Sequence, residues 1–320
     1  MNKTLWLVGA GKMAQDYAKV LHGLGVEFEV VGRGENSAQR FHEVTGKEVL
    51  TGGIHSILET YGAPEQAIVA VNVEHLAEVS GALISHGTRR LLIEKPGGVS
   101  INEINQLGAL AEQHHAEVLV AYNRRFYAST HKVKEAILED GGAVSCIFEF
   151  TEWSHVIGPS VRGPGVKENW FLANSTHVVD LAFHLCGFPK EISARVGGSL
   201  YWHPAAARFA GSGVSERDIV FSYSADWEAP GRWGVEVLTR KARYILRPME
   251  KLHCTRVGSV AIEEITLDDA LDKTYKPGLY RQTEAFLTGD RGALCTIQEQ
   301  VRHGQLYKKM AGYDQRGTAN

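Results

Sequence analysis

The sequence has few cysteines, no excess of positive charge and no long apolar segment. Its four cysteines are spread far apart among 320 residues, so they form neither a disulfide framework nor a pair with metal-ligand spacing. We expect them to be buried, reduced thiols. With 34 Lys and Arg against 37 Asp and Glu, the chain lacks a basic field that would attract nucleic acid or an anionic membrane. Polar residues interrupt every apolar run well before the roughly 18 residues of a membrane-spanning helix.

Several catalytic and targeting signatures are also missing. The sequence has no Gly-x-Ser-x-Gly elbow, no Walker loop and no zinc signature. Its closely spaced histidines, His114–His115 and the pair His75 and His86, lack cysteine or carboxylate partners at ligand spacing, so we expect no metal site. The apolar stretch Leu5–Gly9 is too short for a signal peptide. These absences together predict a cytoplasmic protein.

The first third of the chain alternates between strand and helix patterns. A hydrophobic fraction of 44% and a length of 320 residues predict a globular protein of two domains. Apolar runs that are buried on both faces predict parallel strands, and helical periodicity separates them. The expected strands are residues 5–8, 28–31, 67–71, 90–94 and 117–122, and the expected helices are residues 12–24, 36–44, 75–86 and 101–114.

The pattern changes after Tyr122. Alternating polar and apolar residues predict strands over residues 144–150, 191–196, 218–224, 233–239, 243–246 and 261–265. Helical spacing predicts helices over residues 128–139, 176–186, 279–288 and 297–311. The fold class is therefore α/β: an N-terminal domain over residues 1–121 with a parallel sheet, and a C-terminal α+β domain over residues 122–320 with an open, mostly antiparallel sheet. The tail Asp314–Asn320 is expected to fray.

A glycine-rich turn joins the first strand to the first helix. Residues Gly9–Ala14 fit the pattern G-x-G-x-x-A. Gly9 allows the tight turn, Gly11 lets a pyrophosphate approach the backbone, and the small third residue lets the helix pack on the strand. The first helical turn, which begins with Lys12 and Met13, offers unpaired N–H groups to phosphates. The N-terminal domain is thus predicted to be a Rossmann domain that binds a dinucleotide.

The end of the second strand indicates which dinucleotide. A site that prefers NAD usually carries Asp or Glu there to bind the ribose 2′-hydroxyl, but this strand ends in Gly32. Arg33 can pair with a 2′-phosphate and stack on adenine, and Ser37 can donate a further hydrogen bond. Glu35 would argue for NAD, but it lies beyond the strand end. We expect NADP(H), with NAD(H) as the alternative.

Three motifs in combination resemble a known family. Glu94-Lys95-Pro96 follows the fourth expected strand, Tyr122–Phe126 follows the fifth, and His177–Asp180 lies on a helix of the second domain. With the Rossmann pattern, they resemble the glucose–fructose oxidoreductase, inositol dehydrogenase and rhizopine-catabolism (Gfo/Idh/MocA) family. The resemblance covers nearly the whole chain. It implies a dehydrogenase or reductase acting on sugars, sugar derivatives or polyols.

The resemblance also implies roles for individual residues. It makes Lys95 and His177 the catalytic pair, with Lys95 binding the reacting hydroxyl and the nicotinamide ribose. Neutral histidine, with an ordinary pKa near 6.5, suits proton removal from an alcohol, and a lysine cation stabilises the developing alkoxide. Two further residues, Asn72 and Glu94, are expected to contact the cofactor. The expected substrate contacts are Asn123, Arg125, Trp170 and Asp180.

One position departs from the family pattern. The family's helix motif reads Asp-x-x-x-His, whereas Ala173 here stands four residues before His177. The departure keeps open the alternative of a non-catalytic cofactor-binding sensor. A separate alternative is a relative that cleaves glycosides through a redox cycle. His184, on the same helical face as His177, is the other candidate base. We expect a carbohydrate substrate and a homodimer or homotetramer formed through the exposed face of the antiparallel sheet.

Overall fold

The computed structural model describes residues 5–314, so the tail expected to fray lies, apart from its first residue, outside the described residues. The described chain divides into two compact units. The N-terminal unit comprises the residues up to Tyr122, Gly163–Val166 and Thr274–Gly304; the C-terminal unit comprises Asn123–Arg162, Lys167–Lys273 and the residues from Gln305 onward. Between residues 5 and 314, no helix combines the length and the apolar character needed to cross a membrane.

The N-terminal unit is built on a seven-stranded sheet with the strand order β15-β6-β5-β4-β1-β2-β3. Its parallel part, read from β3 to β6, has the 3-2-1-4-5-6 order of a Rossmann fold, as the sequence predicted. The short edge strand β15 pairs antiparallel with β6. The strands are β1 (Leu5–Val8), β2 (Glu29–Val31), β3 (Val49–Leu50), β4 (Gln66–Val69), β5 (Arg90–Glu94), β6 (Glu117–Ala121) and β15 (Cys295–Thr296).

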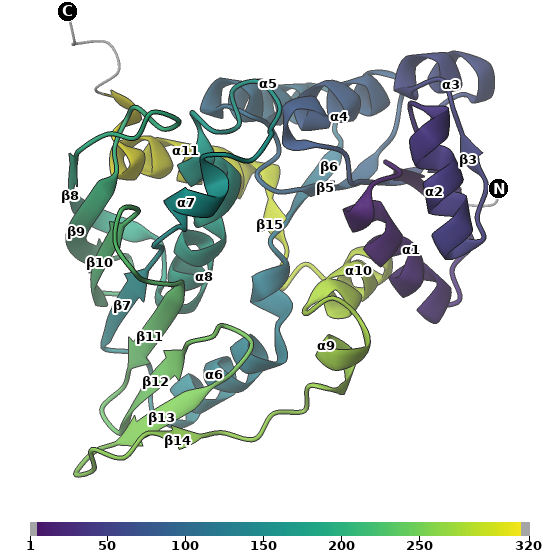
Figure 1. Cartoon of the computed structure of the whole chain (residues 1–320). Coiled ribbons are helices and arrows are strands. Elements are labelled where there is room, and N and C mark those ends of the chain that lie inside the picture. Colours follow the sequence, from purple (N-terminus) through teal and green to yellow (C-terminus); the bar gives the residue numbers. More distant parts are fainter. Residues whose placement is uncertain (1–4, 315–320) are drawn as a thin grey trace, which may run out of the picture. The chain divides into compact units, whose positions relative to one another are not determined.

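Helices cover both faces of this sheet, because its strands are apolar on both sides. Figure 1 shows α4 and α5 on one face and α1 and α10 on the other. The helices are α1 (Lys12–Gly23), α2 (Glu35–Thr45), α3 (Ile54–Tyr61), α4 (Leu76–Ser85), α5 (Ile101–Gln113), α10 (Leu279–Thr288) and α11 (Ile297–Ala311), with a 3-10 turn, η1 (Val73–His75). Only the part of α11 up to Gly304 is grouped with this unit.

The unit departs from the sequence-based division in one respect. Residues 274–304, expected in the C-terminal domain, pack with the N-terminal unit. They do so because β15 extends the Rossmann sheet beside β6 and α10 packs on α1. The sequence analysis did not predict β3 or α3. For β3 the reason is its length, because two residues carry no periodicity.

The C-terminal unit contains an eight-stranded sheet, in the order β14-β13-β12-β11-β7-β10-β9-β8, with helices against one face. All paired strands are antiparallel except β7 and β10, which are parallel. The strands are β7 (Ser145–Glu149), β8 (Pro189–Gly197), β9 (Arg208–Ser215), β10 (Val220–Asp226), β11 (Gly234–Leu238), β12 (Ala242–Leu246), β13 (His253–Arg256) and β14 (Glu263–Glu264).

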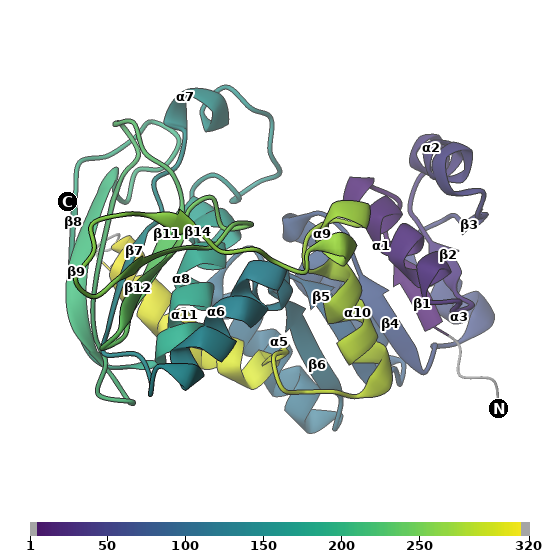
Figure 2. The same ribbon diagram turned by 90° about the horizontal axis from the view of Figure 1, so that it is seen from below.

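One face of this sheet is buried and aromatic. Along β10 buried and exposed residues alternate, and the buried Phe221 and Tyr223 stack with Phe148 of β7. Helix α8 packs on β7 and β11 (Figure 2). The unit's helices are α6 (Ala128–Glu139), α7 (Ser154–Ile157), α8 (Thr176–Cys186) and α9 (Ala270–Thr274), which runs one residue beyond the unit. They are joined by a 3-10 turn, η2 (Asn123–Phe126), and a π-helix, η3 (Phe171–Ser175).

Strand β9 was missed because its sequence, rich in glycine and serine, lacks a strand pattern. The structure explains the glycines. A Cβ at Gly213 would lie 2.0 Å from the carbonyl oxygen of Glu191, and one at Gly211 would lie 2.4 Å from the hydroxyl of Tyr223. Neither position has room for a side chain, so glycine is needed for the close approach of neighbouring strands.

All four cysteines are buried and none forms a disulfide, as expected.

Candidate functional site

A cleft of about 540 Å³ lies in the N-terminal unit where β1, β2 and β4 end. This is the edge at which Rossmann folds bind dinucleotides, and the volume lies within the usual range for small-molecule sites. Five of the eight residues expected to bind the cofactor line the cleft: Gly9, Gly11, Arg33, Ser37 and Asn72. The other three do not line it: Lys12 and Met13 lie in the first turn of α1, and Glu94 ends β5.

The two glycines of the turn serve different purposes. Gly9 has a φ of 125°, and a Cβ there would lie 2.4 Å from the carbonyl oxygen of Ala70. Gly11, the residue before α1, has no atom within 4 Å of its Cβ position. The space above Gly11 is therefore open at a helix N-terminus, where unpaired N–H groups bind phosphate. This backbone fits a dinucleotide pyrophosphate.

Arg33 lies in the cleft at the end of β2. Its Nη1 atom is 3.2 Å from Nε2 of His75, which also lines the cleft. Glu35, the residue that could have favoured NAD, instead accepts a hydrogen bond of 2.6 Å from the Thr51 hydroxyl and does not line the cleft. The carboxylate among the lining residues is Glu78, which lies 3.7 Å from His75.

The absence of an acidic residue at the end of β2 has a structural reason. A Cβ at Gly32 would lie 2.8 Å from Cγ1 of Val49 on β3. A side chain at this position requires Val49 to shift. The packing of β3 therefore disfavours the carboxylate that NAD-preferring sites usually carry here.

The turn Glu94–Pro96 is held by buried groups of the N-terminal unit. The Tyr17 hydroxyl donates to Oε1 of Glu94 (3.0 Å), and Nε2 of Gln300 donates to the carbonyl of Pro96 (2.9 Å) and to the hydroxyl of Tyr122 (3.0 Å). Burial raises the pKa of Glu94, and the positive charge of the adjacent Lys95 opposes that shift. Both neighbours of Lys95, the Glu94 side chain and the Pro96 carbonyl, are thus held by contacts that the sequence analysis did not identify.

His177 lies in the first turn of α8 in the C-terminal unit. It is buried, and its ring centroid is 6.0 Å from that of Trp233. The guanidinium of Arg124 lies 4.8 Å from the Trp233 ring. Burial lowers the pKa of Arg124. Arg124, which the sequence analysis did not single out, thus contacts the same Trp233 ring that lies beside His177.

Arg125 and Asp180 form a buried ion pair. Nε of Arg125 donates to Oδ2 of Asp180 (2.8 Å) and Nη2 to Oδ1 (2.5 Å), and both side chains are almost fully buried. Two parallel hydrogen bonds are the strongest geometry for such a pair. The pair joins η2 to α8; the substrate contacts expected of both residues stay predictions.

The remaining two expected substrate residues are buried as well. Asn123 lies on η2, and its side chain bonds to Tyr127. Trp170, just before η3, packs edge-on against Trp202 at 6.0 Å, with the guanidinium of Arg162 5.5 Å from its ring.

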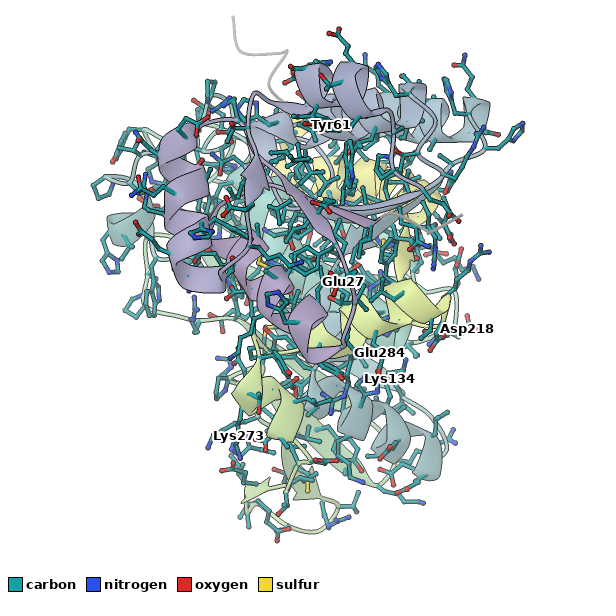
Figure 3. All side chains as sticks on the ribbon, turned by 90° about the vertical axis from the view of Figure 1, so that its right-hand side faces the viewer. Glu27, Tyr61, Lys134, Asp218, Lys273 and Glu284 are labelled. Atoms are coloured by element: carbon teal, nitrogen blue, oxygen red, sulfur yellow. The ribbon has the colours of Figure 1, made fainter. Side chains whose placement is uncertain are left out.

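His184, the other candidate base, has cationic surroundings. Its Nε2 atom lies 3.3 Å from Nζ of Lys134, which is labelled in Figure 3. Burial, followed by the charges of Arg125, Lys134 and Arg217, holds the pKa of His184 well below its ordinary value. The imidazole is therefore neutral at pH 7 and a weaker base than an ordinary histidine.

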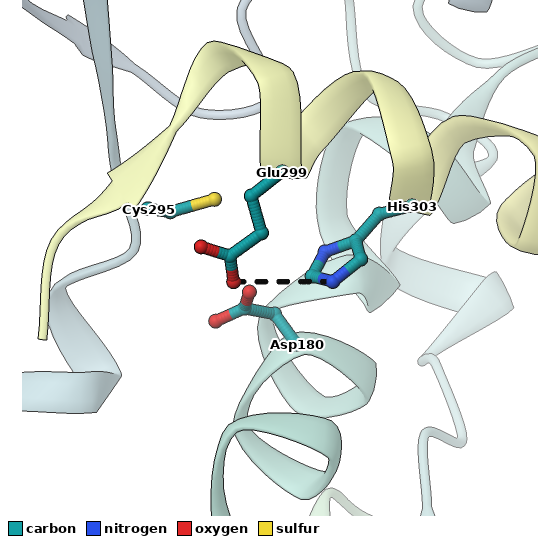
Figure 4. Close-up of side chains that lie close together, drawn as sticks. All are labelled: Asp180, Cys295, Glu299 and His303. Carbon is teal, nitrogen blue, oxygen red and sulfur yellow. Dashed lines mark ion pairs between the residues drawn. The ribbon is translucent and has the colours of Figure 1, made fainter. Parts of the chain in front are cut away.

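A cluster that could ligate a metal was also missed. In Figure 4, Nε2 of His303 lies 3.9 Å from a carboxylate oxygen of Glu299, one helical turn away on α11. Cys295 precedes this helix, and its thiol donates to the carbonyl of Thr296. Cysteine, histidine and carboxylate at such intervals match the ligand chemistry of zinc.

Glu152 is a buried carboxylate that the sequence analysis did not single out. Nδ2 of Asn174 lies 3.1 Å from both of its oxygens, and the Ser175 hydroxyl donates to Oε1 at 2.8 Å. Burial raises its pKa, and these hydrogen bonds lower it. Asn174 and Ser175 directly precede the helix of His177. A carboxylate from the end of β7 is thus bound next to Ala173, where the family pattern has its aspartate.

Comparison with known proteins agrees with the fold. A family model described as "Oxidoreductase family, NAD-binding Rossmann fold" (GFO_IDH_MocA) matches residues 4–122. No curated protein matches the sequence.

Solved structures match nearly the whole chain at low identity. UDP-N-acetylglucosamine 3-dehydrogenase GnnA from Acidithiobacillus ferrooxidans is 14% identical, with a TM-score of 0.72 and 97% of each chain covered. An oxidoreductase from Agrobacterium radiobacter, in complex with NAD+, L-tartaric acid and magnesium, is 13% identical, with a TM-score of 0.77 and coverage of 99% of this chain and 98% of its own. The WlbA dehydrogenase from Chromobacterium violaceum, in complex with NADH and UDP-GlcNAcA, is 15% identical, with a TM-score of 0.71 and coverage of 98% and 94%. At these identities the likeness establishes the fold.

Proposed function

We propose that this chain is an NADP(H)-dependent oxidoreductase, because its residues 4–122 match the family model described as "Oxidoreductase family, NAD-binding Rossmann fold". It transfers a hydride between nicotinamide and a secondary alcohol or ketone of a sugar, sugar derivative or polyol. The single observation that carries this proposal is the cleft at the end of β1, β2 and β4, with the open Gly11 position at a helix N-terminus.

The preference for NADP(H) rests on the charges of the cleft. Among the described residues that line the cleft, Arg33 is the only lysine or arginine. A planar guanidinium with several donors suits a 2′-phosphate. His75 accepts a hydrogen bond from Arg33 and so helps to position the guanidinium, and the hydrogen bond from Thr51 holds the Glu35 carboxylate outside the lining of the cleft, which leaves Glu78 as its carboxylate among the described residues.

The sugar substrate is supported by relatives of the same fold. GnnA is named a UDP-N-acetylglucosamine dehydrogenase, and the WlbA structure holds a UDP-sugar together with NADH. A shared fold does not by itself carry over a substrate. The sugar is therefore assigned by analogy, and the motifs around Lys95 and His177 strengthen the analogy.

The chemistry divides between the cofactor and the chain. When bound, the nicotinamide accepts the hydride of the alcohol or returns it to the ketone. Lys95, held between the bound Glu94 and Pro96, stabilises the negative charge that develops on the substrate oxygen. We assign His177 as the group that takes the hydroxyl proton in oxidation and returns it in reduction.

The decisive experiment measures cofactor binding and turnover together. NADPH and NADH are titrated into the full chain by fluorescence, and NADP+ reduction is then followed with a panel of sugars, nucleotide sugars and polyols. We expect NADPH to bind at least about tenfold more tightly than NADH, a difference of about 1.4 kcal/mol, and at least one sugar to be oxidised. Equal affinities would overturn the NADP preference. Tight cofactor binding without turnover in either direction would favour the non-catalytic sensor instead.

A further inference from the structure

Three side chains of the N-terminal unit, Cys295, Glu299 and His303, bring a sulfur, an oxygen and a nitrogen atom together (Figure 4). Their ligand atoms lie within 4.8 Å of one another. Residues 5–314 hold no second group in which three or more such ligand atoms approach so closely. Figure 4 also draws Asp180, but both of its carboxylate oxygens accept hydrogen bonds from Arg125. Asp180 is therefore not counted among the ligands.

The backbone that carries these three side chains is held in place. Cys295 lies on β15 and pairs with Val120 of β6. The Thr296 hydroxyl accepts a hydrogen bond of 3.1 Å from the N–H of Glu299 and so caps the start of α11. His303 follows one helical turn after Glu299, so the two side chains lie on the same side of the helix. Ligands on a paired strand and a capped helix lose little freedom when they bind an ion.

Burial and charge suit a dication. Cys295 is fully buried and His303 is 4% exposed, whereas the Glu299 side chain is 37% exposed and leaves a route from solvent. A thiolate and a carboxylate together carry two negative charges, and a neutral imidazole adds none. A histidine–glutamate pair on a helix and a buried thiol are each ordinary when they occur alone. Their convergence at one point is what indicates an ion.

The three kinds of ligand atom favour zinc. Thiolate and imidazole are typical zinc ligands, whereas magnesium and calcium take oxygen ligands. Zinc bonds of about 2.0–2.3 Å in a tetrahedron place the ligand atoms roughly 3.5 Å apart. The side chains therefore need to close by about 1 Å, a movement that rotation of the glutamate and histidine side chains can supply. Three protein ligands leave the fourth position to water.

We propose that Cys295, Glu299 and His303 bind a zinc ion that cross-links β15 to α11. The ion is structural and takes no part in the proposed hydride transfer. Gln300, the residue after Glu299, donates to the Pro96 carbonyl. Zinc thus stabilises the helical turn from which that contact is made.

The test measures metal binding by the full chain without an affinity tag. The protein is purified with a reductant, stripped with a chelator, reloaded with zinc or cobalt(II), and dialysed. We expect about one zinc per chain by mass spectrometry of the metal. Cobalt should give a thiolate-to-cobalt charge-transfer band in the near ultraviolet. Zinc should raise the Tm of the stripped chain by about 3 °C or more, because it binds the folded state.

Substitutions identify the ligands. Cys295→Ser should remove the thiolate-to-cobalt band, and Cys295→Ser and His303→Gln should each lower the zinc affinity at least about tenfold. Cys254→Ser is the matched control, because Cys254 is another buried cysteine, on β13 of the C-terminal unit. It should bind zinc as the wild type does. If either buried replacement fails to fold by circular dichroism, Glu299→Gln decides. Its side chain is partly exposed, and it should also lose at least about tenfold in affinity.

Three results overturn the proposal. The first is less than about 0.2 zinc per chain after dialysis of the reloaded wild type. The second is a cobalt adduct of the wild type without a thiolate band. The third is zinc affinity in the folded Cys295, Glu299 and His303 variants equal to that of the wild type. Any of these would make the cluster a plain ion pair beside a buried thiol.

Discussion

The guanidinium of Arg33 lies 3.2 Å from the Nε2 atom of His75. Arg33 follows β2, whereas His75 ends the turn before α4, so the contact joins the two segments that border the cleft on either side of β1. Arg33 donates to the imidazole of His75, and under the proposed function this pair binds the 2′-phosphate of NADP(H). This contact yields the first two predictions.

Arg33→Ala should remove most of the preference for NADP(H). The guanidinium offers charge-assisted hydrogen bonds to a 2′-phosphate and little to a 2′-hydroxyl. We expect the Kd for NADPH to rise about tenfold or more and the Kd for NADH to change less than about threefold. Fluorescence titration of both cofactors measures this. If Arg33→Ala raises the Kd values for NADPH and NADH by the same factor, Arg33 maintains the shape of the cleft and does not bind the 2′-phosphate.

His75→Ala should weaken the same preference by a smaller factor. Its imidazole holds the Arg33 side chain over the cleft. We expect the ratio of the NADH and NADPH dissociation constants to fall about threefold. His55→Ala is the control, since His55 also lines the cleft but contacts Glu78, at 3.4 Å, and not Arg33. If His75→Ala and His55→Ala lower the ratio of the two dissociation constants equally, the effect comes from losing a histidine in the cleft and not from the contact with Arg33.

Gly32→Asp should fail as a simple switch to NAD. Its new Cβ would meet Val49, so we expect a loss of stability of about 1–3 kcal/mol, typical of overpacking. The double variant Gly32→Asp, Val49→Ala should recover part of that loss and bind NADH more tightly than NADPH. Urea denaturation and cofactor titration of both variants check this. If Gly32→Asp alone is as stable as the wild type, Val49 on β3 can shift at little cost in free energy.

Lys95→Ala should reduce turnover by a factor on the order of 100, the range seen when an electrostatic or acid–base group is removed. Cofactor affinity should change little, because the pyrophosphate binds the Gly9–Ala14 turn. Lys132→Ala is a suitable control, since Lys132 is exposed on α6 and pairs with Glu135. The measurement is kcat and KM for the sugar found in the panel. Near-normal turnover would show that the family role of this lysine does not apply to this chain.

His184 should make the fold less stable in mild acid. Because burial and nearby cations hold its pKa well below 6.5 in the folded state, the unfolded chain takes up the proton first as the pH falls. The stability that neutral His184 contributes is complete above the unfolded pKa near 6.5 and is lost as the pH falls toward the folded pKa. His184→Gln, whose side-chain oxygen can accept from Lys134, should lose less stability between pH 7.5 and pH 5 than the wild type.

Urea denaturation at several pH values measures this difference. His42→Gln serves as its control, because His42 is exposed on α2. Identical pH dependence in wild type and His184→Gln would show that His184 is protonated as readily in the folded chain as in the unfolded one.

The sequence by itself determined the elements and the local turns. Helices α1, α5, α6, α8, α10 and α11 begin and end within about a residue of the expected bounds, because apolar periodicity and terminal residues such as Ser100, the N-cap of α5, act within a few residues. The parallel sheet and the glycine turn followed from the same local signals, but the strand order and β3 did not. Arg33 could be identified because the end of a strand is also a local feature.

The tertiary structure alone decided which side chains meet. The Thr51 hydroxyl donates to the Glu35 carboxylate, and Val49 fills the space that a side chain at Gly32 would need. Asp180 accepts hydrogen bonds from Arg125. Each contact partner comes from another element, so the residues next to it in the sequence do not predict the contact. Glu152 is the clearest case: the residues that bind it, Asn174 and Ser175, lie more than 20 positions away in a π-helix that no periodicity predicted. Such contacts depend on how strands and helices pack, and packing is set by the whole fold rather than by the pattern of any one segment.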